Sequence, residues 1–385
     1  MQPSRMPTVL ARHYRSGAAL RITWEGAAIT AAVAAGPSPD AWIAPALLDI
    51  QVNGYGGLDF SQAGHVAHIA ALLAVHGVAR FCPTVITDEP ATMAGALAAI
   101  AGALEGDRDL RRAVPGIHLE GPYISEVDGP RGAHPREHVR DPEWAHFEGL
   151  QHAAGGRIRI VTLAPERPGA EAFIERAAAA GLLVAIGHTA ADADTIGRAV
   201  AAGARLSTHL GNGLAATLDR HRNPIWPQLA RGALHASFIA DGVHLPADAL
   251  AAMMAAKGTE RCVLVSDAVR HAGLPAGRYL GAGGTEVEVD ADGRIRLAGT
   301  PYLAGSGAHL AQCVAFAARV GAATLPAALD MAARHPARLL GLPAPTLEPG
   351  APADLVLYRL DPAGALAVQA TVRAGAVVFG ALPEA

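Results

Sequence analysis

The central part of the chain alternates short apolar runs with amphipathic stretches. Runs of strand length lie at residues 46–52, 79–84, 113–119, 157–163, 182–187, 205–209, 235–239 and 262–266. Helical stretches separate most of them, at residues 66–76, 91–104, 169–180, 192–202 and 246–256. No Gly-x-Gly-x-x-Gly follows the first run, which counts against an open dinucleotide-binding sheet. The alternation predicts an α/β protein with a (β/α)8 TIM-like barrel.

Both ends of the chain show strand patterns of their own. Residues 19–24 and 27–35 could pair as a hairpin around Gly26, and residues 354–358 and 370–379 are similarly β-rich. We therefore expect a small β-sandwich domain built from residues 1–44 and 345–385, with the barrel at residues 45–344. A further β-hairpin, at about residues 279–298 around Asp292-Gly293, is expected as an insertion in the barrel.

Composition and charge narrow the possible partners. The chain has 385 residues, of which 51% are hydrophobic and 17% charged, with a net charge of -4. It has no cluster of Lys and Arg of the kind that binds nucleic acid, so no nucleic-acid partner is expected. The most apolar early run, residues 27–35, is too short to cross a bilayer, and no signal peptide is evident. We expect a cytoplasmic protein without a membrane partner.

Four of the predicted strands end in a residue that can bind a metal or carry a proton. Glu120, His188, His209 and Asp267 each follow an apolar run directly. In a barrel these positions converge on the rim where catalytic groups lie. A single histidine at a strand end is more often structural, but four such residues at equivalent positions form a specific pattern.

The residue types suggest a hydrolytic metal site. Glu120, His188 and His209 offer one carboxylate and two imidazoles, which suit Zn2+ with one position left open for water. Such a metal lowers the pKa of its water and yields a hydroxide nucleophile. Asp267 would accept the water's proton and deliver it to a leaving group.

Short motifs around these positions carry a family resemblance. They are HLEGP at residues 118–122, GHT at 187–189, THLGNG at 208–213, ADGVH at 240–244 and VSDA at 265–268, with LDIQVNG at 48–54 and PADLV at 352–356. In this order they resemble the N-acetylglucosamine-6-phosphate deacetylases of the amidohydrolase superfamily. The resemblance spans nearly the whole chain.

The resemblance implies roles for individual residues. Glu120, His188 and His209 match the ligands of one divalent metal ion per subunit, with Zn2+ expected first and Fe2+ or Co2+ also accepted. Asp267 matches the general base and acid. The remaining matches concern substrate. The resemblance implies that His244 contacts the sugar and helps polarise the acetyl carbonyl, that His134 touches substrate from a loop, and that Asn212 and Gly213 hold the ligand at its phosphate.

Two departures from common family patterns bear on the chemistry. Gln51 stands where many amidohydrolases have a histidine for a second metal, and the fourth strand has no lysine, so a mononuclear site is expected. The loop after Asn212 is longer than usual. Either Arg220 or Arg222 could match the arginine that reaches the phosphate, which in this family comes from the neighbouring subunit of a homodimer.

The leading hypothesis is hydrolysis of the acetamide of an N-acetyl amino sugar 6-phosphate, with N-acetylglucosamine 6-phosphate as the first candidate. One alternative is a related amidohydrolase that deacylates a non-phosphorylated amino sugar or amino acid. Another is a non-catalytic binding barrel. The position of Arg220 and Arg222 relative to the rim, and a metal assay, separate these possibilities.

Overall fold

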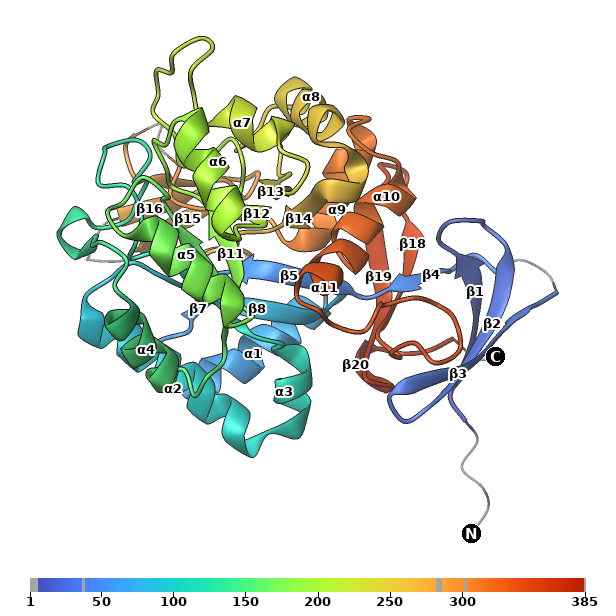
Figure 1. The fold of residues 1–385 in the computed structure, drawn as a ribbon. Helices are drawn as coiled ribbons and strands as arrows, with labels where there is room; N and C mark the ends of the chain where they lie inside the picture. The colour runs from blue at the N-terminus through green and yellow to red at the C-terminus, as the bar shows by residue number, and fades with distance from the viewer. Residues whose placement is uncertain (1–5, 37–38, 282–285, 301–302, 384–385) are drawn as a thin grey trace.

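In the computed structural model, residues 6–36, 39–281, 286–300 and 303–383 are described (Figure 1). Eight parallel strands form one sheet in the order β14-β13-β12-β11-β10-β9-β8-β5. The sheet closes where the Asp267 amide donates to the Gln51 carbonyl at 3.0 Å and Val52 bridges Ala268. The predicted barrel is confirmed. Its strands are β5 (Leu47–Val52), β8 (Val78–Ile86), β9 (Ile117–Glu120), β10 (Ile158–Leu163), β11 (Leu183–Ile186), β12 (Leu206–Ser207), β13 (His235–Ile239) and β14 (Cys262–Val265).

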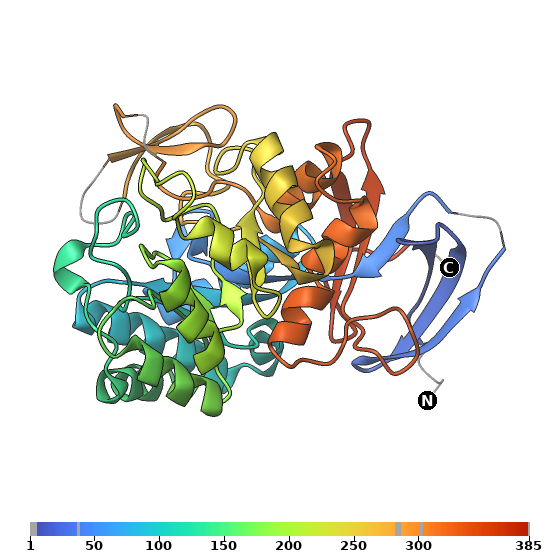
Figure 2. The same cartoon turned by 45° about the horizontal axis from the view of Figure 1, so that its top comes forward.

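Helices surround the barrel (Figures 1 and 2). Apolar spacing explains how they pack: on α5 the buried residues Ala170, Phe173, Ile174 and Ala177 recur every three or four positions. In the described parts of the chain, no helix has the length and apolar character that a bilayer crossing requires. The helices are α1 (Ala63–Ala74), α2 (Pro90–Gly106), α3 (Arg108–Ala113), α4 (Trp144–Ala153), α5 (Ala170–Ala179), α6 (Ala193–Ala202), α7 (Ile225–Ala230), α8 (Ala247–Lys257), α9 (Leu310–Arg319), α10 (Leu325–Met331) and α11 (Arg334–Leu339).

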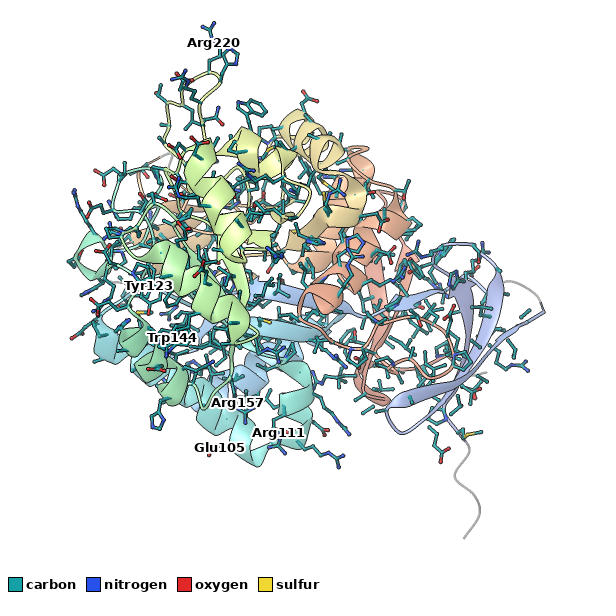
Figure 3. The ribbon with its side chains drawn as sticks, viewed as in Figure 1. Glu105, Arg111, Tyr123, Trp144, Arg157 and Arg220 are labelled. Carbon is teal, nitrogen blue, oxygen red and sulfur yellow. The ribbon has the colours of Figure 1, made fainter. Side chains whose placement is uncertain are left out.

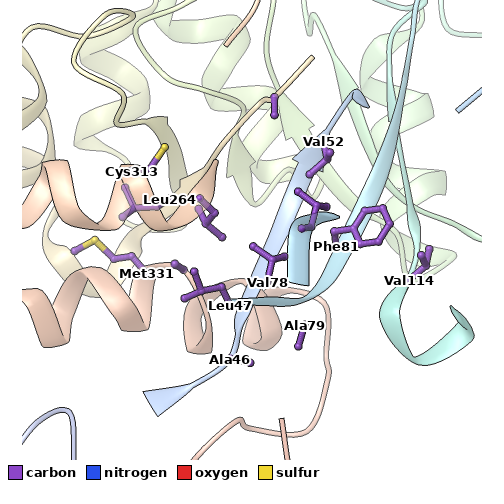
Figure 4. Packing of buried hydrophobic residues seen from close by; sticks show 14 of the residues in the cluster. Ala46, Leu47, Val52, Val78, Ala79, Phe81, Val114, Leu264, Cys313 and Met331 are labelled. Carbon is purple, nitrogen blue, oxygen red and sulfur yellow. The ribbon is translucent and has the colours of Figure 1, made fainter. Parts of the chain in front are cut away.

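The apolar core has an outer and an inner part. The outer part lies between strands and helices, where Leu47, Val78, Phe81 and Met331 belong to one buried cluster (Figure 4). A second cluster has members on barrel strands, among them Cys82, Ile160 and Leu206. Two residues further along these strands, on the same face, stand the buried threonines Thr84, Thr162 and Thr208. The barrel interior therefore changes from apolar to polar toward the carboxyl ends of its strands.

Strands from both chain ends form the small β domain. Seven strands pair in the order β20-β19-β18-β4-β1-β2-β3. The two halves of the sheet fold toward each other, because Ala28 bridges Pro352 and the Trp24 indole donates to the Gly375 carbonyl at 2.9 Å. The boundaries at residues 44/45 and 344/345 stay a prediction. The strands are β1 (Thr8–His13), β2 (Ala19–Glu25), β3 (Ala28–Ala34), β4 (Trp42–Pro45), β18 (Leu355–Leu360), β19 (Leu366–Arg373) and β20 (Ala376–Gly380).

The predicted insertion after the eighth barrel strand is a three-stranded antiparallel sheet. Strands β16 (Glu286–Val289) and β17 (Ile295–Leu297) form the expected hairpin, and β15 (Gly277–Leu280) adds a third strand. Residues 282–285 of the predicted segment lie outside the described residues. A second small ribbon, β6 (Gly54–Tyr55) with β7 (Leu58–Asp59), follows the first barrel strand.

One predicted strand, residues 113–119, is wrong at its start. Ala113 ends helix α3, and β9 begins only at Ile117. The helix forms because the Asp107 side chain accepts hydrogen bonds from the amides of Asp109 and Leu110, both at 2.8 Å. An apolar run that begins in a helix and ends in a strand shows no break in hydrophobicity, so its pattern alone does not locate the boundary.

Candidate active site

The four strand-end residues come together as the sequence predicts, and their backbone is unusual. Among non-glycine residues of the described chain, positive φ angles occur at His188 (51°), His209 (29°), Asp267 (51°) and Ala374 (48°). Such angles are costly for L-residues and gather at functional sites. Three of the four belong to the predicted site, so the chain turns sharply where each strand ends and directs these side chains inward.

The carboxylate and two imidazoles of the predicted metal site converge. Glu120 Oε1 lies 2.9 Å from His209 Nε2 and 3.2 Å from His188 Nε2, and the two Nε2 atoms are 3.1 Å apart. All three side chains are buried. Burial by itself would raise the pKa of Glu120, but hydrogen bonds from both histidines outweigh it and hold that pKa well below its usual value. The carboxylate is therefore the ionised form.

Neighbouring groups orient two of these ligand candidates. His188 Nδ1 donates to the Pro130 carbonyl at 3.0 Å, so Nε2 is the nitrogen that faces Glu120 and would give up its hydrogen when a metal ion binds. Gln51 Nε2 donates to Glu120 Oε1 at 2.9 Å. Partners of this kind fix the ring tautomer and the carboxylate orientation in metal sites. One carboxylate and two imidazoles held in this way fit a divalent metal ion.

A third histidine, His134, also lies close to this cluster. Donor atoms of Glu120, His134 and His188 all lie within 4.8 Å of one another. His134 packs its ring against His188 with centroids 4.4 Å apart, and its Nδ1 lies 2.8 Å from Thr87 Oγ1. Burial, followed by the charge of His188, lowers the pKa of His134 to about 3, so its ring is neutral. His134 was predicted to touch substrate, and it stands beside the proposed ligands.

Asp267 has a partner that the sequence does not single out. Asn53 Nδ2 donates to Asp267 Oδ1 at 2.7 Å, while Asn53 Oδ1 is buried with no hydrogen-bond partner. Burial, reinforced by the negative charge of Glu120, raises the pKa of Asp267 to about 6. A carboxyl whose pKa lies this near neutrality can both take up and release a proton.

His244 is held by its own loop. Its Nδ1 lies 2.7 Å from Asp241 Oδ2, and Asp241 Oδ1 accepts the amides of Val243 and His244, both at 2.8 Å. Burial would raise the pKa of Asp241, but the hydrogen bond from His244 outweighs it and lowers that pKa. Because Nδ1 is committed to Asp241, Nε2 is the nitrogen free to meet a substrate.

Asn212 and Gly213 contact the ligand candidates. Asn212 Nδ2 donates to the His209 carbonyl at 3.2 Å. Gly213, with φ of 60°, approaches His188 so closely that a Cβ there would lie 2.9 Å from His188 Nδ1. Both residues were predicted to hold substrate. In the structure they also support the two histidines.

Arg220 and Arg222 do not join the cluster within one chain. Both are exposed, and Arg220 lies at the tip of a loop that projects from the body of the barrel (Figure 3). The loop is ordered by Asp219, whose Oδ1 accepts the amides of His221 at 2.9 Å and Arg222 at 2.6 Å. Arg220 therefore faces outward, away from the body of the barrel (Figure 3).

Replacing Gly213 by alanine is expected to weaken metal binding about 10-fold or more, because the new Cβ displaces the His188 ring that Pro130 orients. The positive φ adds strain. Chelator competition would measure the affinity. Gly232→Ala is the matched control, since nothing lies within 4 Å of a Cβ at that position. Equal affinities in both variants would contradict this role for Gly213.

Comparisons with known proteins agree with this site. The profile of the amidohydrolase family matches residues 42–379. The chain is 38% identical over 356 residues to N-acetylglucosamine-6-phosphate deacetylase from Bos taurus, covering 88% of this chain and 83% of that protein. It is 35% identical over 309 residues to N-acetylgalactosamine-6-phosphate deacetylase from Shewanella sp. (strain ANA-3), covering 77% and 73%.

A solved structure extends the likeness to the whole fold. N-acetyl-D-glucosamine-6-phosphate deacetylase from Mycobacterium smegmatis, solved as an aspartate-to-alanine mutant in complex with N-acetyl-D-glucosamine-6-phosphate, superposes with a TM-score of 0.84 at 32% identity, covering 96% of this chain and 99% of that chain. The fold and site define a barrel hydrolase with a candidate metal centre. The chain belongs to the amidohydrolase family, in the group of the N-acetylglucosamine-6-phosphate deacetylases.

Proposed function

We propose that this protein hydrolyses the acetamide of N-acetylglucosamine 6-phosphate to acetate and the amino sugar phosphate. The observation that carries the proposal is the convergence of the buried Glu120, His188 and His209 at the barrel rim, together with Asp267, whose pKa is raised by burial and then by the charge of Glu120. The chain is also 38% identical to a deacetylase named for this substrate. A binding barrel without catalysis would not require these buried charges to be kept together.

Each residue of the site has its own part in the proposed reaction. A bound divalent ion would supply Lewis acidity and lower the pKa of water at the site; Glu120, His188 and His209 would hold it. Asp267 takes the proton from the attacking water as the carbon–oxygen bond forms. It then delivers that proton to the nitrogen as the carbon–nitrogen bond breaks, which releases the amine and acetate. His244, fixed by Asp241, presents Nε2 to the acetyl carbonyl oxygen.

We propose Zn2+ as the ion, because one carboxylate and two imidazoles suit it, although such sites also accept Fe2+ or Co2+. A single ion per subunit is supported by Gln51. Its amide donates to Glu120 at the place where many relatives have a histidine ligand. A donor N–H cannot bind a cation, so in this orientation Gln51 supports the first site and offers no ligand to a second.

The phosphate contact and its source are part of the same proposal. Because Arg220 projects outward, we propose that it or Arg222 reaches the site of the neighbouring subunit in a cytoplasmic homodimer (Figure 3). N-acetylgalactosamine 6-phosphate is a second candidate substrate, favoured by the 35% identity to a deacetylase of that sugar. Deacylation of a non-phosphorylated amino sugar or amino acid remains the alternative in which neither arginine contributes.

Acetate release by zinc-loaded protein tests the proposal, with N-acetylglucosamine 6-phosphate, its galactosamine epimer and N-acetylglucosamine compared in parallel. We expect the highest kcat/KM on the first. Arg220→Ala and Arg222→Ala should identify the phosphate contact: one of them raises KM for the phosphorylated sugar only. Activity restricted to non-phosphorylated substrates would contradict the phosphate assignment, and metal-loaded protein without amidase activity would contradict the proposed function.

A further inference from the structure

Three buried polar side chains lie just below the proposed metal ligands, and the mechanism above uses none of them. They are His118, Thr162 and Thr208, with exposures of 1%, 0% and 3%. His118 Nδ1 lies 3.2 Å from the Ile50 carbonyl, and its Nε2 lies 2.7 Å from Thr162 Oγ1. Thr162 Oγ1 lies 2.7 Å from Thr208 Oγ1. His118, Thr162 and Thr208 are called the buried relay below.

Elementary donor and acceptor chemistry gives the buried relay one direction. A carbonyl only accepts, so His118 Nδ1 carries the hydrogen that meets Ile50. In a neutral imidazole Nε2 then accepts, so the Thr162 hydroxyl donates to it. Thr162 has no second hydrogen, so the Thr208 hydroxyl donates to Thr162. Each hydrogen has one acceptor, and reversing any link would leave a buried group unsatisfied.

The buried relay joins strands that do not pair with each other. His118 on β9 reaches Ile50 on β5 across β8, and Thr162 on β10 reaches Thr208, just beyond β12, across β11. Gly187 follows β11 at this level. A Cβ on Gly187 would lie 2.7 Å from Thr162 Cγ2 and 2.8 Å from Thr208 Cβ. The absence of a side chain on Gly187 is what allows the two threonines to meet.

The buried relay adds a side-chain tie to a segment that the backbone already holds, because the Thr208 amide donates to the Ile186 carbonyl and the Leu210 amide to the Ser237 carbonyl, both at 2.8 Å. Strand β12 has only two residues, each with one partner on β11 and one on β13. His209 follows directly after Thr208, and Glu120 stands two residues after His118. The relay thus ties the strand that carries Glu120 to the segment that carries His209, while their ligand atoms lie 2.9 Å apart.

We infer that the buried relay is a positioning device that sets the spacing of Glu120 and His209 and thereby the affinity for the divalent ion. The inference rests on the proposed function, since it concerns the same metal site. None of the three side chains needs to touch the ion or the substrate. Partners that orient metal ligands typically change affinity 10- to 100-fold when they are removed.

Thr208→Val is the mildest test, because it removes only the terminal hydroxyl and keeps the side-chain shape. We expect its zinc affinity, measured by chelator competition, to fall about 10- to 100-fold, with an altered visible spectrum of the Co2+-loaded form. Thr162→Val should act similarly. Thr208→Ser and Thr162→Ser, which keep the hydroxyl, should restore wild-type affinity. In the double valine variant the losses should be less than additive, because the two residues share one hydrogen bond.

Thr371→Val is the matched control. Thr371 is fully buried in the small β domain, and its hydroxyl donates to the Ala74 carbonyl at 2.7 Å. The Thr371→Val variant therefore loses a comparable hydrogen bond far from the site. It should lower the melting temperature without changing zinc affinity. Wild-type affinity and spectrum in folded Thr208→Val and Thr162→Val would overturn the inference and leave the proposed function intact. Wild-type protein that binds no divalent ion would overturn both.

Discussion

The Asp267→Asn variant is expected to lose about 10²- to 10⁴-fold in kcat for acetate release while it keeps the metal stoichiometry of the wild type. An amide cannot take a proton from water or return it to the leaving amine. The geometry should persist, because Asn53 Nδ2, which lies 2.7 Å from Asp267 Oδ1, can donate equally to an amide oxygen. Steady-state kinetics and elemental analysis on the same preparation measure the two quantities.

Asp361→Asn is the control for this experiment. Asp361 is exposed in the turn after β18, where Oδ1 accepts the amides of Ala363 and Ala365 at 2.8 Å, a role that asparagine performs as well. Its kcat should equal that of the wild type. If Asp267→Asn retained kcat within a few-fold with full metal content, Asp267 would not be the proton carrier, and another group would have to protonate the amine.

Loss of metal is the expected result of His209→Ala, whereas His134→Ala should retain it. Both imidazoles are near Glu120 and His188, so proximity alone leaves either one as the third ligand. His209 Nε2 lies 2.9 Å from Glu120 Oε1 and 3.1 Å from His188 Nε2. His134 instead commits Nδ1 to Thr87 and stands on a loop. Metal per subunit after dialysis against a weak chelator should fall to near zero only in His209→Ala.

The two histidine variants serve as controls for each other, because each removes one buried imidazole from the same site. His134→Ala should raise KM, since its predicted role is to touch substrate. If His134→Ala lost the metal and His209→Ala retained it, His134 would be the ligand and His209 would not. Full metal content in both variants would mean that Glu120 and His188 suffice with other donors, and the predicted ligand set would be wrong.

The barrel and its rim residues could be predicted because each depends on local sequence. An apolar run that ends in Glu120, His188, His209 or Asp267 specifies both a strand and the residue at its carboxyl end. In a parallel barrel those ends meet on one rim whatever the details of packing. The order of motifs along the chain then indicated the family, which the whole-chain comparisons confirm.

Other features follow from contacts between distant segments. The start of β9 was misplaced because helix α3 depends on a cap at Asp107 rather than on a change in hydrophobicity. The outward direction of Arg220 depends on the conformation of a long loop, which apolar periodicity does not describe (Figure 3). His118 lies in the HLEGP motif, two residues before Glu120. Residues two apart on a strand share one face, so this spacing could have indicated a second polar side chain directed inward.

The sequence by itself determined the fold class, the four strand-end residues and the family, since periodicity and motif order are properties of consecutive residues. Only the tertiary structure decided how these residues are supported. Gln51 meets Glu120 across 69 positions of the chain, and Asn53 meets Asp267 across 214. Hydrogen bonds of this kind depend on the closure of the barrel and on positions without a side chain, such as Gly187. No local propensity encodes them, because each donor finds its acceptor only after the strands have packed.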